Sequence, residues 1–277
     1  MPESKISLTV ITPVFNGEKY IENCLKNVAE QAFEGLEHLV MDGGSSDGTV
    51  QIVQSYQDNF SHIRLISEKD RGQSDAMNKG IREAKGSIIG FLNVDDYYEP
   101  DVLRRIPALF SDLVEPSFIS GNLNIWNSDG SFRHFNRPNR ISFIEILSGI
   151  YEIPYNPSAY FYHKSLHEKA GFYDTEDHFA MDFEFIVRAA SHISLVHIDE
   201  VWGNFCLVPE SKTQNQFSMH KNPTAKRGED VRNHYIRQLN PSDLQKLVQI
   251  KNAANPPVRQ SKSIRDKIKY YLGKFRR

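Results

Sequence analysis

The chain has 277 residues, a formal net charge of −2, 39% hydrophobic residues and 25% charged residues. This length suffices for one large α/β domain with an ample core, with or without a C-terminal extension. The nearly neutral charge argues against a general nucleic-acid binder, and no apolar segment approaches the roughly 18 residues that a membrane span needs.

The two cysteines, Cys24 and Cys206, stand in no paired spacing. This usage predicts a reducing compartment and excludes a cysteine-based metal site. The N-terminal residues MPESKISLTV run directly into a predicted strand, without the apolar core of a signal peptide. We therefore expect a cytoplasmic protein, at most peripheral on the inner face of a membrane.

The first 112 residues alternate between predicted strands and predicted helices. β-Branched and apolar runs favour strands, and apolar residues at helical spacing favour helices. A strand–helix alternation of this kind predicts a parallel sheet with helices on both faces. The predicted strands are 6–14, 38–41, 63–67 and 88–92, and the predicted helices are 18–31, 50–56, 72–84 and 101–110.

Three of these strands end at aspartates: Asp42, Asp70, and the adjacent pair Asp95 and Asp96. Because parallel strands end at one edge of the sheet, we expect these carboxylates to converge on one crevice, where α/β sheets bind ligands. Each aspartate alone would also suit a helix cap or a turn. The convergence of three strand ends favours a binding site.

The pattern changes after residue 112. We expect a hairpin, then short helices and strands, then a helix with Asp182 in its first turn, and finally two strands. The predicted ranges are 118–126 and 131–135 for the hairpin, 141–148, 164–170 and 179–190 for helices, and 158–163, 194–198 and 201–206 for strands.

Several common catalytic motifs are absent from the sequence. It contains no GxGxxG, GxxxxGK[ST], HExxH or GxSxG, and its ten histidines lack metal-ligand spacing. What remains is a set of carboxylates at strand ends, which suit Mg²⁺ or Mn²⁺ bridging phosphate oxygens. A diphosphate leaving group would be a natural partner for such a cation.

Four segments in this order resemble the family 2 glycosyltransferases of the GT-A fold. They are VITPVFNGEKYIENCLKNVAEQ, HLVMDGGSSDGT, DRGQSDAMNKGI and GFLNVDD. The resemblance covers roughly residues 6–215 and implies a Rossmann-like parallel sheet merged with a mixed acceptor-binding part. It implies a domain over 1–215, with a nucleotide-sugar-binding half at 1–112 and an acceptor and catalytic-base half at 113–215, followed by a helical C-terminal extension at 216–277.

The resemblance also implies roles for single residues. Asp182 would be the general base that deprotonates an acceptor hydroxyl, with inversion at the anomeric carbon, and Asp96 would ligate Mn²⁺ or Mg²⁺ on the donor diphosphate. The acceptor would be a saccharide or lipid-linked saccharide of a cell-surface polysaccharide. The implied nucleotide-binding residues are Pro13, Val14, Phe15, Asn16, Glu18, Asp42, Asp70, Arg71, Gly72 and Asp95.

The sequence departs from the family pattern near the base and the acceptor. Met181 replaces the usual glutamate before Asp182, so Glu184 is a possible substitute. Asp182 would also suit a helix start without catalysis. Asn156 stands where related sequences contact the acceptor. The pair Ser211 and Lys212 resembles a lid over the diphosphate, or is a solvated loop.

The last twenty residues, 258–277, carry eight basic residues against Asp266 alone. Ile264, Ile268 and Leu272 fall on one predicted helical face with Tyr271 and Phe275. This pattern fits an interfacial helix on anionic lipid, or a helix packed on the body or a second subunit. For the whole chain, the rival functions are a nucleotidyltransferase and a non-catalytic nucleotide-sugar-binding protein.

Overall fold

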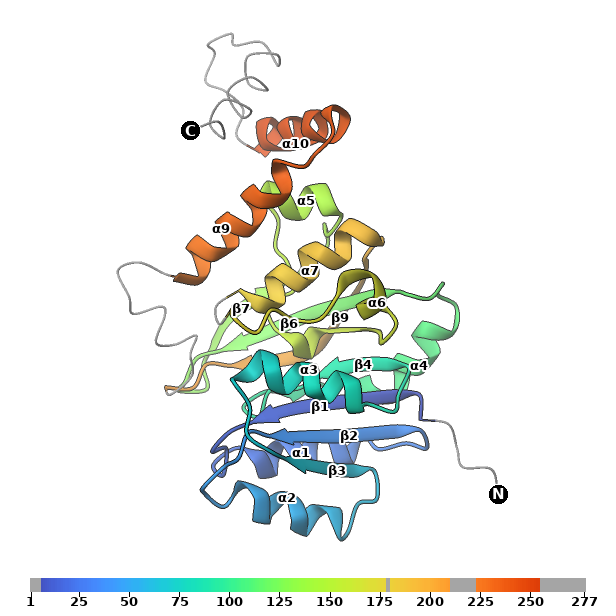
Figure 1. Cartoon of the computed structure of the whole chain (residues 1–277), viewed down its shortest axis with the longest axis vertical. Coiled ribbons are helices and arrows are strands. Elements are labelled where there is room, and N and C mark those ends of the chain that lie inside the picture. The colour runs from blue at the N-terminus through green and yellow to red at the C-terminus, as the bar shows by residue number, and fades with distance from the viewer. Residues whose placement is uncertain (1–5, 178–179, 210–222, 255–277) are drawn as a thin grey trace.

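The computed structural model describes residues 6–177, 180–209 and 223–254 (Figure 1). A single mixed sheet of nine strands runs through this part of the chain, in the order β3-β2-β1-β4-β8-β6-β9-β5, with β7 paired to β6. Helices cover both faces of the sheet. The N-terminal four strands are parallel, and the direction changes where β4 meets β8.

The parallel half consists of β1 (Leu8–Val14), β2 (Leu36–Asp42), β3 (Ile63–Ser67) and β4 (Ile88–Phe91). Every residue of β1, β2 and β4 is buried, as the apolar runs of β1 and β4 predict. In β2 the buried residues include the polar Glu37, His38 and Asp42. Figure 1 shows α3 (Gln73–Glu83) in front of these strands and α1 (Ile21–Glu30) behind them. The helix α2 (Thr49–Gln57) packs beside α1. The predicted parallel sheet with helices on both faces is confirmed.

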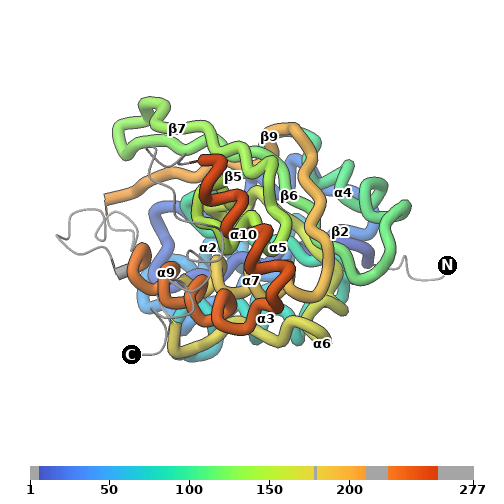
Figure 2. Tube along the Cα trace, turned by 90° about the horizontal axis from the view of Figure 1, so that it is seen from above, coloured from blue at the N-terminus to red at the C-terminus, as the bar shows by residue number. Residues whose placement is uncertain are grey.

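The mixed half begins with β8 (Tyr160–His163), which is antiparallel to both β4 and β6 (Phe118–Trp126). The predicted hairpin is confirmed, since β6 pairs antiparallel with β7 (Phe132–Asn136) and projects from the edge of the molecule in Figure 2. Beyond β6 lies β9 (Val196–Cys206), which runs parallel to it.

Two strand predictions in this half are wrong. The segments 194–198 and 201–206 form one strand, β9, whose register with β6 shifts around Asn122. Asp199 and Glu200 suggest a break in sequence, but Asn122 and two arginines hold their carboxylates at this irregularity. The strand β5 (Tyr97–Tyr98) was not predicted, because only pairing with distant β9 defines its two residues.

The remaining short elements connect the strands and cover the sheet. The helices α4 (Val102–Ser111), α5 (Phe143–Ser148), α6 (Leu166–Ala170) and α7 (Met181–His192) all correspond to predicted helices, with shifted ends. A 3-10 turn, η1 (Pro157–Ala159), replaces the start of the predicted strand 158–163. Ser142 and Glu145 form a capping box at the start of α5.

The C-terminal helices α9 (Pro223–Ile236) and α10 (Pro241–Ala254) pack onto α5 and α7 (Figure 1). Their buried residues Val231, Ile236, Leu244 and Leu247 join the same core as α3 and α7. None of the helices in the described ranges is both long and apolar enough to cross a membrane. The predicted lid residues Ser211 and Lys212 and the tail 258–277 lie outside the described residues.

Candidate functional site

The loop after β1 and the loop after β2 are joined by reciprocal hydrogen bonds. The Asn16 backbone N–H donates to Ser45 Oγ at 2.8 Å, and Asn16 Oδ1 accepts from the Ser46 N–H at 2.9 Å. Glu18 Oε2 accepts from the Gly48 N–H at 3.0 Å. Asn16 has a φ of 51°, a conformation that asparagine tolerates better than most residues. These two predicted nucleotide-binding residues therefore also fix the two loops to one another.

Asp42, at the end of β2, is buried and organises the loop that follows it. Its carboxylate accepts hydrogen bonds from the Gly44 and Ser45 backbone N–H groups, both at 3.1 Å, and from the Ser67 hydroxyl at 2.6 Å. Phe15, in the neighbouring loop, is 63% exposed, which is unusual for a phenylalanine and leaves its ring face open to a ligand.

The segment 70–72 lies beside the β2 loop, as expected for the end of β3. A Cβ added to Gly43 would meet Asp70 Oδ2 at 2.4 Å, so only glycine permits this approach. Asp70 Oδ1 accepts from the Gly72 N–H at 2.8 Å, and Gly72 has a φ of +121° that favours glycine. The exposed Arg71 guanidinium reaches Thr175 Oγ1 at 3.5 Å.

Asp95 and Asp96 follow β4 at the same edge of the sheet. Asp96 is 4% exposed, and its carboxylate accepts from Asn156 Nδ2 at 2.7 Å, Asn93 Nδ2 at 3.0 Å and the Cys206 N–H at 3.0 Å. Burial and the adjacent Asp95 charge raise the pKa of Asp96 well above its usual range, and burial also raises the pKa of Asp95. Both carboxylates line a cleft of about 450 Å³ against α1.

This pair fits a divalent cation that completes its shell with ligand oxygens. Two adjacent, poorly solvated carboxylates repel one another, and a cation offsets that repulsion. A carboxylate has about four lone-pair positions, so the three N–H donors leave Asp96 little remaining capacity, whereas Asp95 is the more accessible of the two. Among the residues described, no group of three His, Cys, Asp or Glu side chains forms a metal site. Phosphate oxygens would have to supply the other ligands.

Asp182 lies in the first turn of α7, as the sequence predicts. It is partly buried, and its Oδ1 accepts a hydrogen bond from the buried Tyr160 hydroxyl at 3.1 Å. Burial raises the pKa of Asp182 to about 6; the Tyr160 hydrogen bond lowers it, and the charge of Asp177 raises it. A carboxylate with this pKa is well matched to accept a proton near neutral pH.

The structure gives the other predicted residues of this half different partners. Glu184 forms an ion pair with Arg188 at 2.7 Å, so its carboxylate is already engaged. Asn156 bonds to Asp96 and accepts from the Ser158 N–H at 2.8 Å, which commits its amide to the carboxylate cluster. The predictions that Glu184 replaces the base and that Asn156 contacts the acceptor stay predictions.

Sequence reasoning missed several polar residues that hold these groups. Gln73 Nε2 donates to Asn93 Oδ1 at 2.9 Å, and Asn93 in turn donates to Asp96, which links the start of α3 to the carboxylate pair. Tyr160 lies in an aromatic strand, and its contact with Asp182 could not be predicted, because a buried tyrosine is usually a core residue. Only Asn93, two residues before Asp95, could have been found by position.

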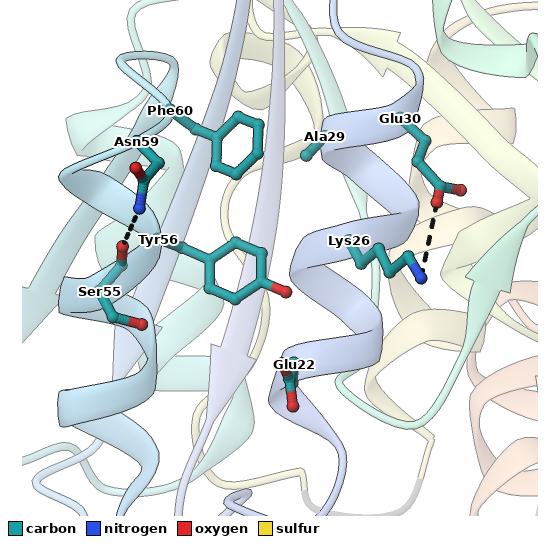
Figure 3. A pocket seen from close by; sticks show the side chains of 8 residues that line it. All are labelled: Glu22, Lys26, Ala29, Glu30, Ser55, Tyr56, Asn59 and Phe60. Carbon is teal, nitrogen blue, oxygen red and sulfur yellow. Dashed lines mark hydrogen bonds and ion pairs between the residues drawn. The ribbon is translucent and has the colours of Figure 1, made fainter.

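A separate groove of about 590 Å³ lies between α1 and α2 and holds none of the predicted site residues (Figure 3). Tyr56 and Phe60 project from α2 and the turn after it toward α1, with stacked rings whose centroids are 5.7 Å apart. On α1, Lys26 pairs with Glu30 at 4.0 Å on the exposed surface. The groove is therefore an interhelical surface away from the strand ends.

A family model described as "Glycosyl transferase family 2" matches residues 9–171, more than half of the chain. The chain belongs to glycosyl transferase family 2. A Mycobacterium tuberculosis protein described as an uncharacterized glycosyltransferase is 34% identical over 186 residues, covering 66% of this chain and 69% of that protein. Chondroitin synthase of Escherichia coli is 35% identical over 97 residues, which is 35% of this chain and only 14% of the synthase.

Solved structures agree with this family at the level of the fold. S. aureus TarS 1–349 in complex with UDP-GlcNAc superposes with a TM-score of 0.68 at 18% identity, covering 90% of this chain and 72% of that one. The mannosyltransferase PcManGT from Pyrobaculum calidifontis, in complex with GDP-Man and Mn2+, has a TM-score of 0.55 at 19% identity and covers 96% of this chain and 79% of that one. The predicted GT-A fold is confirmed.

Proposed function

We propose that this glycosyltransferase moves a hexosyl or N-acetylhexosaminyl unit from a nucleoside-diphosphate donor to a hydroxyl of a saccharide acceptor, with inversion. The observation that carries the proposal is Asp182, a partly buried carboxylate with a pKa of about 6 on an element separate from the strand-end carboxylates. The neighbouring structures contain UDP-GlcNAc and GDP-Man, which supports a nucleotide-sugar donor. Family membership favours glycosyl transfer over nucleotidyl transfer.

The donor nucleotide is assigned to the edge formed by the loops after β1, β2 and β3. Phe15 supplies an exposed ring for stacking on a base. Asp42 and Asp70 would accept hydrogen bonds from the base and ribose, and Pro13, Val14 and Asn16 would border the nucleotide with their backbone. Arg71, Gly72 and Glu18 complete this proposed set. The hydrogen bonds that join these loops would hold them in a fixed arrangement before the donor binds.

The donor diphosphate is assigned to the Asp95–Asp96 pair. A bound Mn²⁺ or Mg²⁺ would neutralise the charge that develops on the departing diphosphate. Asp96 is the predicted ligand, and the more accessible Asp95 would face the ribose and the sugar. Because Asp95 and Asp96 line the same cleft, substitutions must test the two carboxylates separately. Lys212 of the predicted lid would add a positive charge from outside the described residues.

The reaction would proceed as a single displacement. Asp182, ionised above pH 6, would accept the proton of the acceptor hydroxyl while that oxygen forms a bond to the anomeric carbon. The bond from the anomeric carbon to the diphosphate oxygen breaks, and its electron pair leaves with the diphosphate. Attack from the side opposite the leaving group inverts the anomeric configuration.

The acceptor and the cellular location are proposed from the comparisons and from the charge of the tail. The match to chondroitin synthase favours a polysaccharide acceptor, and a lipid-linked saccharide would suit a basic tail that contacts the membrane surface. We propose a cytoplasmic enzyme on this basis. The remaining rival is a nucleotide-sugar-binding protein without transfer activity, which would bind the donor through the same loops but would not depend on Asp182.

A donor screen followed by two substitutions tests the proposal. Thermal unfolding is measured with nucleotide-sugars and Mn²⁺, because a bound donor raises the unfolding temperature. Nucleoside diphosphate release is then measured for the wild type, Asp96→Ala and Asp95→Ala, with Asp101→Asn as a control. Asp101 is exposed, has a φ of 61° that asparagine also tolerates, and pairs with Arg104.

We expect Asp96→Ala to lose metal-dependent donor binding and Asp101→Asn to retain it. Donor binding that is unaffected by EDTA and by both alanine substitutions would refute the metal assignment. No thermal response to any nucleotide-sugar would refute the donor class. Stabilisation by a donor without any release of its diphosphate would favour the non-catalytic rival.

A further inference from the structure

Asp182 is held by a buried hydroxyl from the sheet behind α7. Tyr160 lies on β8 with no exposed surface, and its hydroxyl donates to Asp182 Oδ1 at 3.1 Å. Because the donor is buried and the ring is stacked on Phe118 at 5.0 Å, the hydroxyl has a fixed position. It therefore fixes the orientation of the carboxylate that accepts this hydrogen bond.

A second contact reaches the start of α7 from the C-terminal helices. Asp177 is buried; its Oδ1 accepts from the Ala180 N–H at 2.9 Å, and its Oδ2 accepts from Arg227 Nε at 2.9 Å. Arg227 lies on α9, fifty residues further along the chain. Ala180 is the N-cap residue of α7, so this hydrogen bond fixes the backbone directly before Met181 and Asp182.

We propose that Tyr160 and the Asp177–Arg227 ion pair are positioning residues of the catalytic base. Helix α9, which carries Arg227, is therefore part of the active-site structure. This inference rests on the proposed function, because it assigns a role around Asp182. It extends that function to the C-terminal helices, which lie beyond the segment that matches the family model.

Packing supports a fixed position for α9. Val231 and Ile236 of α9 are buried in the core that also contains Phe183 and Ile186 of α7. The guanidinium of Arg232, also on α9, lies over the Phe183 ring at 4.7 Å from its centroid. An arginine on a helix held in this way reaches Asp177 in one defined geometry. The packing of α9 on α7 therefore maintains the Arg227–Asp177 contact in the folded protein.

The charges around Asp182 determine whether the loss of each contact raises or lowers the pKa of Asp182. The facing titratable groups are Tyr160, Tyr162 and Tyr173, whose phenols are buried, and Asp177, whose charge is offset by Arg227. Loss of the Tyr160 hydroxyl removes a bond to the ionised form of Asp182 and must raise its pKa. Loss of the Asp177 charge must lower that pKa, and loss of the Arg227 charge must raise it.

The inference is tested on the full chain with four variants. Tyr160→Phe and Arg227→Gln should each move the pKa of Asp182 upward, and Asp177→Asn should move it downward. A hydrogen bond to a charged group predicts about one pH unit for Tyr160→Phe. Tyr162→Phe is the comparison variant: it removes a hydroxyl from the same buried cluster that lies 3.1 Å from His167 Nε2 and beside Tyr173, and has no direct hydrogen bond to Asp182. Its effect on the pKa of Asp182 should therefore be smaller than that of Tyr160→Phe.

The first readout does not depend on activity. The carboxyl carbon signal of Asp182 is followed by NMR titration in protein labelled with ¹³C-aspartate, and the signal is identified by its loss in Asp182→Asn. Thermal unfolding confirms that each variant is folded; if Arg227→Gln does not fold, Tyr160→Phe and Asp177→Asn still give opposite predicted signs. An Asp182 pKa that does not move in Tyr160→Phe, or that moves equally in Tyr162→Phe, would overturn the inference.

The second readout is the pH profile of diphosphate release with the donor identified by thermal unfolding. The acidic limb should move with the NMR pKa in each variant. If Asp182→Asn retains full activity, the assignment of the base fails, whatever the NMR titration shows. If Asp182→Asn is inactive but the acidic limb stays fixed while the NMR pKa moves, the positioning role fails and the base assignment stands.

Discussion

Replacement of Asp182 by asparagine should stabilise the folded protein, because the native fold disfavours the ionised form of this carboxylate. Its pKa rises from the ordinary 3.8 to about 6. A group whose pKa is raised on folding is neutral in both states below pH 3.8 and does not oppose folding there. As the pH rises from 3.8 to 6, the unfolded chain ionises this carboxyl freely while the fold disfavours its charge, so stability is lost across this interval and the loss is complete above pH 6.

The magnitude follows from that interval. The pKa rise of about two units corresponds to a loss of about 3 kcal/mol in the free energy of unfolding at pH values above 6. At pH 4.5 the same relation gives a loss of only about 1 kcal/mol, because this pH is just above the ordinary pKa of 3.8 and ionisation stabilises the unfolded chain only a little. The helix dipole favours aspartate over asparagine in the first turn by about 0.3–1 kcal/mol. The net gain expected for Asp182→Asn is about 2 kcal/mol at pH 7.5. At pH 4.5 it is about 1 kcal/mol, because the native carboxyl is protonated there and the dipole no longer favours aspartate.

Urea unfolding at these two pH values measures the effect, since the transition midpoint reports stability when its slope is unchanged. The control is Glu184→Gln, which lies in the same turn of α7 and loses its ion pair with Arg188. This control should be neutral or destabilising at both pH values. A gain for Asp182→Asn that is the same at pH 4.5 and 7.5, or a loss at pH 7.5, would refute the reasoning.

Three further outcomes follow from the site. Diphosphate release by the wild type should fall about tenfold from pH 7 to pH 5, since a base with a pKa of about 6 is mostly protonated at the lower value; a flat profile would contradict this. Gly72→Ala should lower the free energy of unfolding by about 1–3 kcal/mol, because a φ of +121° strains alanine; an unchanged urea midpoint would argue against that strain. Asn93→Ala should raise the Mn²⁺ concentration for half-maximal activity roughly tenfold, because Asp96 loses a hydrogen bond that stabilises its ionised form. An unchanged Mn²⁺ requirement would show that Asn93 does not affect metal binding.

The parallel half of the fold and its strand ends were predictable from sequence because their signals are local. Runs of apolar and β-branched residues define β1 and β4, the shorter run 39–41 marks β2, and polar residues follow, so Asp42, Asp95 and Asp96 could be placed at one edge. The start of α7 was also predictable, because Asp182 precedes a run of helical apolar spacing. These assignments need only neighbouring residues.

The contacts between distant segments were not predictable in this way. Arg227 and Asp177 are separated by fifty residues, and Asn156 meets Asp96 sixty residues away. The pairing of β5 with β9 joins segments more than a hundred residues apart. No local pattern marks such partners, because an exposed arginine or a buried asparagine looks the same in sequence with or without them. The resemblance to a family predicts Asp182 as the base, but it does not predict the residues that contact Asp182.

Donor binding and transfer measured together on Asp182→Asn test the central claim most directly. The account predicts that this variant keeps the thermal stabilisation by nucleotide-sugar and Mn²⁺, because the donor is assigned to the opposite side of the site. It also predicts that transfer falls by about 10²–10⁴-fold, the usual contribution of a general base. Transfer at the wild-type rate by Asp182→Asn would contradict the account.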